Sequence, residues 1–378
     1  MLPTPVQNCS HSVEPKTVIQ IVPRRTDEPS GVSDYASALA CALRSRGFNT
    51  VFLAANPPGG QRIRIDGLET IWLAKRQARC LADTLQSLAC ETRALGVLLQ
   101  FSGYGYDDRG APLWLLRGLQ RWRSGRARGV PLLTIFHELY AMGRPWHSSF
   151  WLSPVQRLIA RGILDASSYG VATTELYRDR LLEWNPRARI AAVPVFSNVG
   201  EPEHVAPPGA RRSSAVVFGL AGVEDRLFRD LRPQLECAIV RLGIEEITDI
   251  GPRVSKPPTC LAGVPVTSRG ALPPFAVSEL LRQARFGLVA YPLHVLAKSS
   301  AFAAYAAHGT VPVVFAPRRG SFDGLQIGRH FLDGLRLKAV VDMDEHAMIQ
   351  SELSTWYEGH SVKAQARFLD QFAMHPAV

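Results

Sequence analysis

The sequence lacks any apolar run of the roughly 20 residues that a membrane-spanning helix needs, so an integral membrane protein is not expected. Its six cysteines form no CxxC pair and show no metal-ligand spacing, which favours scattered thiols in a reduced, cytoplasmic protein. The amino terminus has prolines and polar residues where an export signal would have a basic start and an apolar stretch. The GxGxxG fingerprint of dinucleotide enzymes and any metal-binding cluster of carboxylates or histidines are also missing, so neither cofactor is expected.

Lysine is scarce as well, with six residues against 37 arginines. The chain of 378 residues is 46% hydrophobic and 20% charged, which is typical of a globular protein and, at this length, of two domains. The charge is uneven, because residues 1–200 hold 24 basic and 15 acidic side chains, whereas residues 201–378 hold 19 and 18. The first half is therefore expected to bind an anionic partner. The partner could be a nucleic acid, a phosphorylated small molecule or an acidic membrane.

From Thr17 onward, short apolar runs alternate with amphipathic segments, which is typical of repeated strand–helix units and a parallel sheet. The segment 196–214, rich in proline, breaks this rhythm, which then restarts. The pattern predicts an α/β protein with two doubly wound, Rossmann-like domains that face each other across a cleft. The expected parts are a flexible leader (1–15), an N-terminal domain (16–200), a linker (201–214), a second domain (215–345) and a C-terminal helical segment that crosses back (346–378).

Individual elements follow from the same periodicities. Strands are expected at 18–22, 50–54, 97–101, 132–136, 169–172 and 190–193, and in the second half at 215–219, 246–250, 264–267, 286–290 and 311–315. Helices are expected at 35–46, 76–89, 113–123, 154–163, 176–183, 226–242, 277–283, 299–308 and 345–372. In such sheets ligands bind in the loops at the carboxyl ends of the strands, so these loops are where functional residues are sought.

A glycine turn follows the first expected strand, where Gly31, Val32, Ser33 and Asp34 open a helix. Glycine lets the backbone approach a ligand closely, and the free N–H groups of a helix start favour a phosphate. Ser33 or Asp34 could equally be a plain helix cap, and the residues alone do not decide between the two interpretations.

The run Gly31 to Ala36, followed by Leu39, Leu43 and Gly47, resembles the opening of the group 1, or family 4, glycosyltransferases of the GT-B fold. Supporting segments occur in the same order, namely PVFSNV at 194–199, VVFGL at 216–220 and AAYAAHGTVPVVF at 303–315. The resemblance implies a nucleotide-sugar donor bound without a metal, with the second domain as the donor-binding one. It further implies a glycan, lipid-linked or small-molecule acceptor and a place in polysaccharide or glycoconjugate biosynthesis.

Two further strand-end loops carry candidate residues. Tyr104, Gly105 and Tyr106 could offer aromatic faces to an acceptor sugar, or could form a tight turn packed by tyrosines. His137 and Glu138 follow the next strand, and the resemblance places such a histidine near the sugar and phosphate of the donor. Glu138 and Asp34 are the candidate bases for an inverting reaction, because a base must reach the acceptor hydroxyl.

The sequence departs from the family at two positions where paired glutamates are usual, since Leu296 and Ala304 stand there. Instead, Lys298, Ser299 and Ser300 open a helix, and the ammonium with the helix-start N–H groups could bind a diphosphate. A solvated surface lysine is the alternative interpretation. The family favours a retaining course, but without its glutamates the course stays open, as does a second function class: a degenerate protein that binds a nucleotide or glycan, or acts as a scaffold, without turnover.

A basic stretch lies in the helix expected at 113–123 and just beyond it. Its cations are Arg117, Arg121, Arg123, Arg126 and Arg128. Mixed with leucines, they could place the helix on an anionic bilayer, or they could form the solvent face of a helix packed on the sheet. The expected location is the cytoplasm, with a peripheral site on the inner membrane face as the alternative, and nucleic-acid binding is not expected because no recognised module is present.

Overall fold

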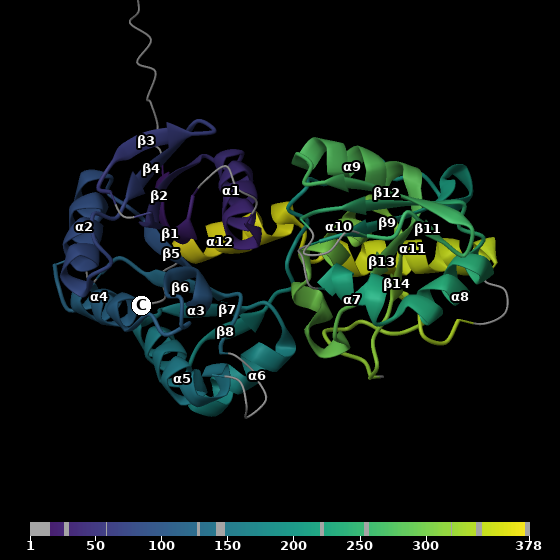
Figure 1. Cartoon of the computed structure of the whole chain (residues 1–378). Helices are drawn as coiled ribbons and strands as arrows, with labels where there is room; N and C mark the ends of the chain where they lie inside the picture. Colours follow the sequence, from purple (N-terminus) through teal and green to yellow (C-terminus); the bar gives the residue numbers. More distant parts are fainter. Residues whose placement is uncertain are drawn as a thin grey trace, which may run out of the picture.

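The computed structural model describes residues 16–25, 30–57, 59–126, 129–140, 148–219, 223–252, 257–318, 320–337 and 342–374. Two α/β domains lie side by side, each with a central sheet flanked by helices (Figure 1). The predicted fold class, two doubly wound Rossmann-like domains, is confirmed.

The first domain is built on an eight-stranded sheet. Its strands are β1 (Lys16–Arg24), β2 (Phe48–Asn56), β3 (Arg62–Ile65), β4 (Leu68–Trp72), β5 (Gly96–Phe101), β6 (Leu132–Phe136), β7 (Tyr169–Ala172) and β8 (Ile190–Ala192). The spatial order is β3-β4-β2-β1-β5-β6-β7-β8, and every pair is parallel except β3 with β4. All residues of β5 and β6 are buried, as expected for central parallel strands covered on both faces.

Helices cover both faces of this sheet (Figure 1). They are α1 (Gly31–Arg44), α2 (Ala78–Glu91), α3 (Gly103–Tyr106), α4 (Leu113–Arg123), α5 (Ser148–Ala166) and α6 (Glu175–Trp184). The close packing of α2 on α4 depends on Gly118, where an added Cβ would lie 2.7 Å from the Leu81 side chain.

The second domain repeats the arrangement on seven strands. They are β9 (Arg212–Phe218), β10 (Glu246–Ile250), β11 (Cys260–Leu261), β12 (Val264–Gly270), β13 (Ala284–Val289), β14 (Val311–Val314) and β15 (Leu332–Asp333), in the order β11-β12-β10-β9-β13-β14-β15. Its helical segments are η1 (Pro208–Ala210), α7 (Val223–Arg229), α8 (Arg232–Leu242), α9 (Pro274–Gln283), η2 (Leu293–Lys298), α10 (Ser300–His308) and α11 (Met343–Glu358). Helix α10 is buried along its whole length apart from its first residue, Ser300.

The last helix, α12 (Val362–Met374), leaves the second domain and packs on α1 of the first (Figure 1). Two polar contacts hold it there: the Tyr35 hydroxyl donates to the Gln365 side chain, and Arg46 pairs with Asp370 at 2.5 Å. The chain therefore crosses between the domains twice, once after β8 and once between α11 and α12.

The structure differs from the expected elements at several places. The hairpin of the edge strand β3 with β4 was not expected, although its Asp-Gly turn between two short strands is a hairpin signal. The helix expected at 226–242 is two helices, since Pro233 starts α8 afresh after α7 has ended. The helix expected at 345–372 is likewise divided, between Gly359 and Ser361. Helix α1 begins at Gly31, four residues earlier than expected, so the glycine turn is the helix start itself.

None of the helices within the described ranges is long and apolar enough to cross a membrane.

Candidate functional site

A cavity of about 590 Å³ lies between the two domains, at the carboxyl ends of the first-domain strands. The first domain contributes the start of α1, helix α3 and the end of β6, and the second contributes the ends of β9 and β13 and the start of α10. Nine of the predicted site residues line this cavity: Gly31, Val32, Tyr104, Gly105, His137, Glu138, Lys298, Ser299 and Ser300. Residues from four separate segments of the sequence are thus brought together.

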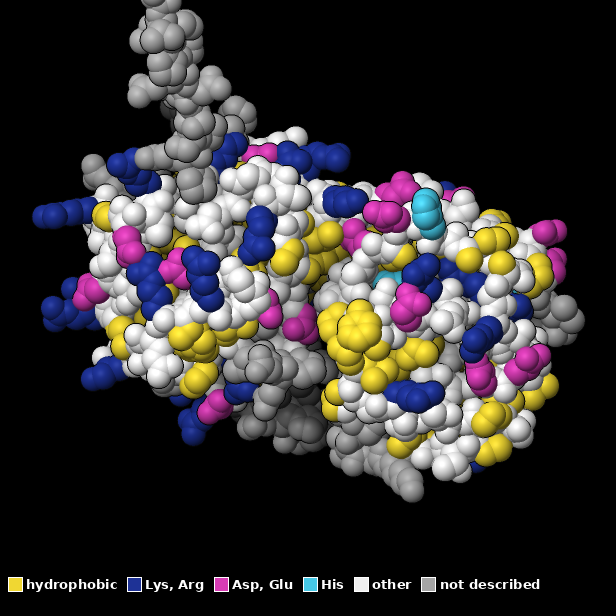
Figure 2. All heavy atoms as spheres, turned by 90° about the horizontal axis from the view of Figure 1, so that it is seen from above, with side chains coloured by type: hydrophobic (Ala, Val, Ile, Leu, Met, Phe, Trp, Pro, Cys, Tyr) yellow, Lys and Arg dark blue, Asp and Glu magenta, His cyan; other side chains and the backbone are white. Residues whose placement is uncertain are grey.

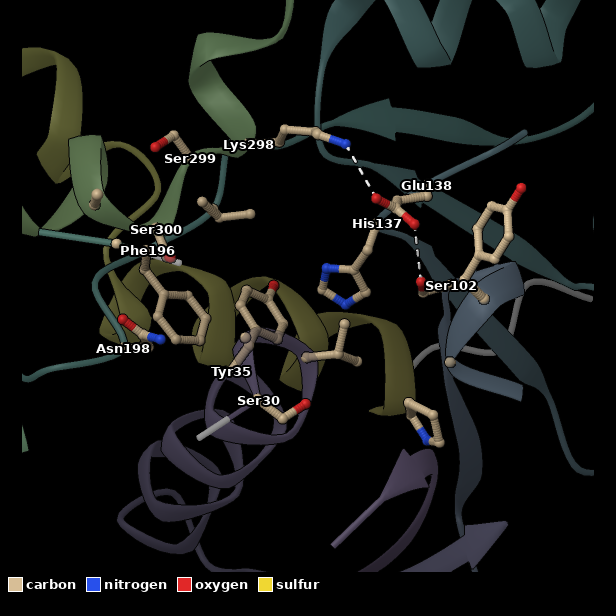
Figure 3. A pocket seen from close by; sticks show the side chains of 18 of the residues that line it. Ser30, Tyr35, Ser102, His137, Glu138, Phe196, Asn198, Lys298, Ser299 and Ser300 are labelled. Carbon is tan, nitrogen blue, oxygen red and sulfur yellow. Dashed lines mark hydrogen bonds and ion pairs between the residues drawn. The ribbon is translucent and has the colours of Figure 1, made fainter. Parts of the chain in front are cut away.

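Lys298 reaches across the cleft from η2 to the first domain (Figure 3). Its Nζ lies 3.5 Å from Glu138 Oε1 and donates a hydrogen bond to the Tyr177 hydroxyl at 3.2 Å. Burial by itself would lower the pKa of Lys298, but the neighbouring tyrosine oxygens and Glu138 outweigh it and raise that pKa above its ordinary value. The side chain is only 17% exposed, so a permanent positive charge stands at the boundary between the domains and is not a solvated surface charge.

The amino terminus of α10 lies beside this charge. Ser299 is the N-cap, and its hydroxyl accepts a hydrogen bond from the N–H of Phe302 at 3.3 Å. Ser300 and Ala301 follow in the first turn and also line the cavity. A helix start presents free N–H groups and the positive end of the helix dipole, so this corner of the cavity is suited to an anion.

Across the cleft, the start of α1 forms the facing wall. An added Cβ at Gly31 would meet no protein atom within 4 Å, so the backbone there is open to a ligand. Ser33 and Asp34 do not line the cavity: the Ser33 hydroxyl donates to the carbonyl of Arg24, and the Asp34 carboxylate accepts from the N–H of Ser30 at 3.2 Å. Burial raises the pKa of Asp34 to about 6. These two residues hold the turn, so of the two candidate bases only Glu138 lines the cavity.

His137 is buried at the cavity wall, and its Nε2 lies 2.8 Å from Gln100 Oε1. Burial, and secondarily the charge of Lys298, lowers the pKa of His137 to about 3. The imidazole is therefore neutral at physiological pH and supplies no positive charge to a phosphate.

The predicted acceptor loop is the short helix α3, and its residues divide between the cavity and the core. Tyr104 is 44% exposed and lines the cavity, whereas Tyr106 is fully buried and its hydroxyl bonds to the carbonyls of Ile21 and Gln100. Tyr106 therefore anchors the loop and does not face a ligand, which corrects the prediction for this residue. Gly105 is required by packing, since an added Cβ would lie 2.7 Å from the Pro23 side chain.

Several cavity residues were not singled out from the sequence. Tyr35 stacks on Phe196 with ring centroids 4.2 Å apart and meets the His137 ring edge-on at 4.9 Å (Figure 3). Asn198 lies in the first crossover and lines the cavity, and its Oδ1 is buried without a hydrogen-bond partner in the described structure. Arg24 adds a second cation at the end of β1. The motifs around residues 31–36 and 194–199 contain three of these four residues, but only the fold assigns their side chains to the cavity.

A smaller cavity of about 220 Å³ adjoins the first and shares Tyr104, Glu138 and Lys298 with it. Tyr140, Tyr177 and Gln156 complete most of its wall. The Gln156 amide donates to the Tyr104 hydroxyl at 3.2 Å and so fixes the ring between the two spaces. The ion pair of Lys298 and Glu138 therefore stands at the junction of a larger and a smaller cavity.

Within the part of the chain that the structure describes, no group of three or more His, Cys, Asp or Glu residues could hold a metal ion.

Comparison with known protein families and solved structures agrees with the fold described above. Residues 30–195 match the family model of the glycosyl transferase 4-like domain. The match lies within the first domain and its crossover to the second, and it covers less than half of the chain. Over its whole length the chain has the GT-B fold and resembles the group 1 glycosyltransferases. No curated protein matches the sequence significantly.

Solved structures with this fold cover almost the whole chain. An α-glucosyltransferase in complex with UDP has a TM-score of 0.58 at 9% identity, covering 95% of this chain and 99% of its own. A glycosyltransferase from Rickettsia africae ESF-5 has a TM-score of 0.58 at 11% identity, with 96% and 98% covered. The pneumococcal O-GlcNAc transferase GtfA in complex with UDP and GlcNAc has a TM-score of 0.57 at 10% identity, with 96% and 99% covered.

The first domain contributes the only carboxylate, Glu138, among the described residues that line the larger cavity. Leu296 and Ala304, which stand at the usual glutamate positions, are both fully buried. Next to Ala304, the Tyr305 hydroxyl accepts from the N–H of Phe218 at 3.1 Å and bonds to strand carbonyls of β9 and β13. Neither of the usual glutamate positions therefore presents a carboxylate to the cavity, and the Tyr305 hydroxyl ties α10 to the backbone of β9 and β13.

The basic stretch of this domain lies on α4 and after it. Leu115, Leu116, Leu119 and Trp122 are buried, so the apolar face of α4 packs in the core and is not available to a bilayer. The Arg123 side chain is tied to the carbonyl of Val130 at 2.9 Å. Arg117, Arg121 and Arg126 are exposed, and Arg128 lies outside the described residues. Figure 2 shows Lys and Arg side chains spread over the first domain with acidic ones among them.

Proposed function

We propose that this protein transfers a sugar from a nucleotide-sugar donor to the hydroxyl of a glycan, a lipid-linked or a small-molecule acceptor. The observation that carries the proposal is the meeting of Lys298 and the start of α10, from one domain, with Glu138, from the other, at the wall of one cavity. A cation beside a helix amino terminus is a site for a diphosphate, and a carboxylate across from it is a base for an acceptor.

In this reaction the bond between the sugar C1 and the diphosphate oxygen breaks, and its electron pair leaves with the nucleoside diphosphate. The ammonium of Lys298 and the N–H groups of Ser300 and Ala301 stabilise the charge that develops on the leaving group. The Gly31 backbone bounds the opposite wall, where no side chain obstructs the ligand.

Glu138 is the base of the proposed mechanism. Its carboxylate is held between Lys298 Nζ on one oxygen and the Ser102 hydroxyl on the other at 3.1 Å (Figure 3). Phosphate oxygens compete with Glu138 for the ammonium when a donor binds, which frees the carboxylate to accept the proton of an acceptor hydroxyl as the new C1–O bond forms. The smaller cavity, walled partly by Tyr104, is the approach for that acceptor, because tyrosine faces suit the apolar face of a sugar.

The test is turnover of a panel of UDP-, GDP- and ADP-sugars, with and without glycan and lipid-linked acceptors, measured as release of nucleoside diphosphate. Release from at least one donor, increased by an acceptor, is the expected result. The anomeric configuration of the product tests the role of Glu138, because an attack assisted by a base on the opposite face inverts it. A retained configuration excludes Glu138 as the base but does not contradict the proposed sugar transfer.

A second candidate function is a binding or scaffold protein with the GT-B fold and no turnover. It is favoured by one observation: Leu296 and Ala304 leave the donor side without a carboxylate among the described residues. Tight binding of a nucleotide sugar without release of diphosphate, whatever the acceptor, supports this function against the first.

A further inference from the structure

A chain of three buried hydrogen bonds crosses the first sheet beneath the larger cavity. Gln20 in β1 and Gln100 in β5 are both fully buried, which is unusual for amide side chains in central strands. The Gln20 Nε2 donates to the carbonyl of Ala36 in α1 at 3.4 Å, and the Gln100 Nε2 donates to Gln20 Oε1 at 3.0 Å. The chain ends at His137, whose Nε2 lies 2.8 Å from Gln100 Oε1.

The direction of these bonds is fixed by the first acceptor. The carbonyl of Ala36 can only accept, so the Gln20 amino group faces it and the Gln20 oxygen is left to accept from Gln100. Gln100 then turns its own oxygen to His137, and an amide oxygen can only accept. The hydrogen of this last bond must come from His137 Nε2. Because burial keeps the ring neutral, it has one N–H only, and Nδ1 carries a lone pair.

We propose that Gln20 and Gln100 are positioning residues that hold His137 as the Nε2–H tautomer, so that Nδ1 accepts a hydrogen bond from a hydroxyl of the ligand in the larger cavity. The ring is held in place from a second direction as well, since Tyr35 meets it edge-on at 4.9 Å. The assignment of the hydroxyl to a substrate sugar rests on the proposed function, but the tautomer does not.

The family resemblance places His137 near both the sugar and the phosphate of the donor. The tautomer decides which of these two groups the ring can bind. Phosphate oxygens at neutral pH only accept hydrogen bonds, and a lone pair on Nδ1 has nothing to give them. A sugar hydroxyl can donate to that lone pair. His137 is thereby assigned to the sugar, and Lys298 with the α10 start to the diphosphate.

The tautomer is measured directly on the free protein by ¹⁵N NMR of histidine-labelled samples, with the His137 signals identified by comparison with His137→Ala. Wild type is expected to show a proton on Nε2 and none on Nδ1 at pH 7. Gln100→Leu removes the acceptor and is expected to give a mixture of tautomers. Thr134→Val is the matched control, because Thr134 is also fully buried in the same sheet but bonds to the Ser167 hydroxyl, at 2.7 Å. A wild-type Nδ1–H signal, or an unchanged tautomer in Gln100→Leu, overturns the proposal.

Gln100→Glu keeps the length of the side chain and the acceptor, and so serves if the leucine variant does not fold. A carboxylate at this position still accepts from Nε2–H and favours the charged imidazole, so the tautomer should persist and the pKa of His137 should rise. An NMR titration in which the His137 signals do not move from their wild-type pH dependence contradicts the proposal. These readouts need no turnover, so they can fail or succeed independently of the glycosyl transfer.

Where a donor is turned over, the KM for that donor gives a further readout. Gln100→Leu is expected to raise it by about tenfold, the loss of roughly one hydrogen bond, and Gln100→Glu to restore it at high pH. A KM that is equal in wild type and both variants contradicts the role of Nδ1 in ligand binding.

Discussion

Replacement of Lys298 by methionine removes the ammonium from the cavity while keeping much of the side-chain volume. At the 3.5 Å that separates Nζ from Glu138, two unit charges interact by about 5 kcal/mol at an effective dielectric constant of about 20. Most of this is offset by desolvation, and a hydrogen bond to a charged group contributes about 1.5–3 kcal/mol net. A diphosphate in the place of Glu138 should lose that amount in Lys298→Met, which corresponds to about 10- to 150-fold weaker binding of the nucleotide.

The assay is isothermal titration of wild type and Lys298→Met with UDP, GDP and ADP. Lys75→Met is the matched control, because Lys75 is an exposed lysine of the same chain that does not line the cavity. Since Glu138 is 46% exposed, water can replace its lost partner, and the free energy of unfolding should change by less than about 1 kcal/mol. Equal affinities in wild type and Lys298→Met, for a nucleotide that wild type binds, would refute the diphosphate assignment.

Three further predictions follow from the same geometry. Glu138→Gln should lower transfer by about 100-fold or more while donor affinity, measured by titration, stays the same or improves; unchanged turnover would exclude its role as base. Gly31→Ala should leave the melting temperature unchanged and weaken donor binding, whereas Gly105→Ala, whose Cβ would lie 2.7 Å from a proline, should cost about 1–3 kcal/mol and melt several degrees lower. The free energy of unfolding should fall as the pH is lowered from 7 to 5. Burial lowers the pKa of several histidines to about 3 or 4, so over this range only the unfolded chain takes up protons at them. Each such histidine should lower the free energy of unfolding by about 2 kcal/mol. These histidines are His137, His308, His346 and His360. Burial raises the pKa of Asp34 and Asp323 to about 6, so these two residues stabilise the folded protein as the pH falls and offset part of the loss. Urea unfolding that shows no decrease in the free energy of unfolding at pH 5 would count against the neutral histidines.

The sequence predicted the fold class and most of the strands, because short and mainly apolar runs such as 97–101 and 132–136 are typical of central strands in a parallel sheet. It also predicted which strand-end residues to examine, since the carboxyl ends of parallel strands meet at one edge. The hairpin at 62–72 was missed because its edge strand β3 is exposed and carries charged residues, so it lacks an apolar run.

The contacts across the cleft could not be predicted in the same way. Lys298 and Glu138 are brought within 3.5 Å by the placement of one domain against the other, which no local pattern encodes. The two buried glutamines were overlooked for a related reason, because Gln20 and Gln100 interrupt apolar strands and only their pairing across the sheet gives them a role. Tyr106 was assigned to the cavity because a strand-end loop has two sides, and the sequence does not show which side faces the core.

The central claim is that the cavity between the domains breaks the C1–phosphate bond of a nucleotide sugar. Proton NMR of the wild-type protein incubated with a donor that it binds, in the presence of candidate acceptors, follows that bond in one experiment. The anomeric signal of the donor is expected to disappear, a new anomeric signal is expected on the product, and Lys298→Met should slow both changes. Donor signals that broaden on binding but persist with every acceptor would contradict it and leave a binding protein.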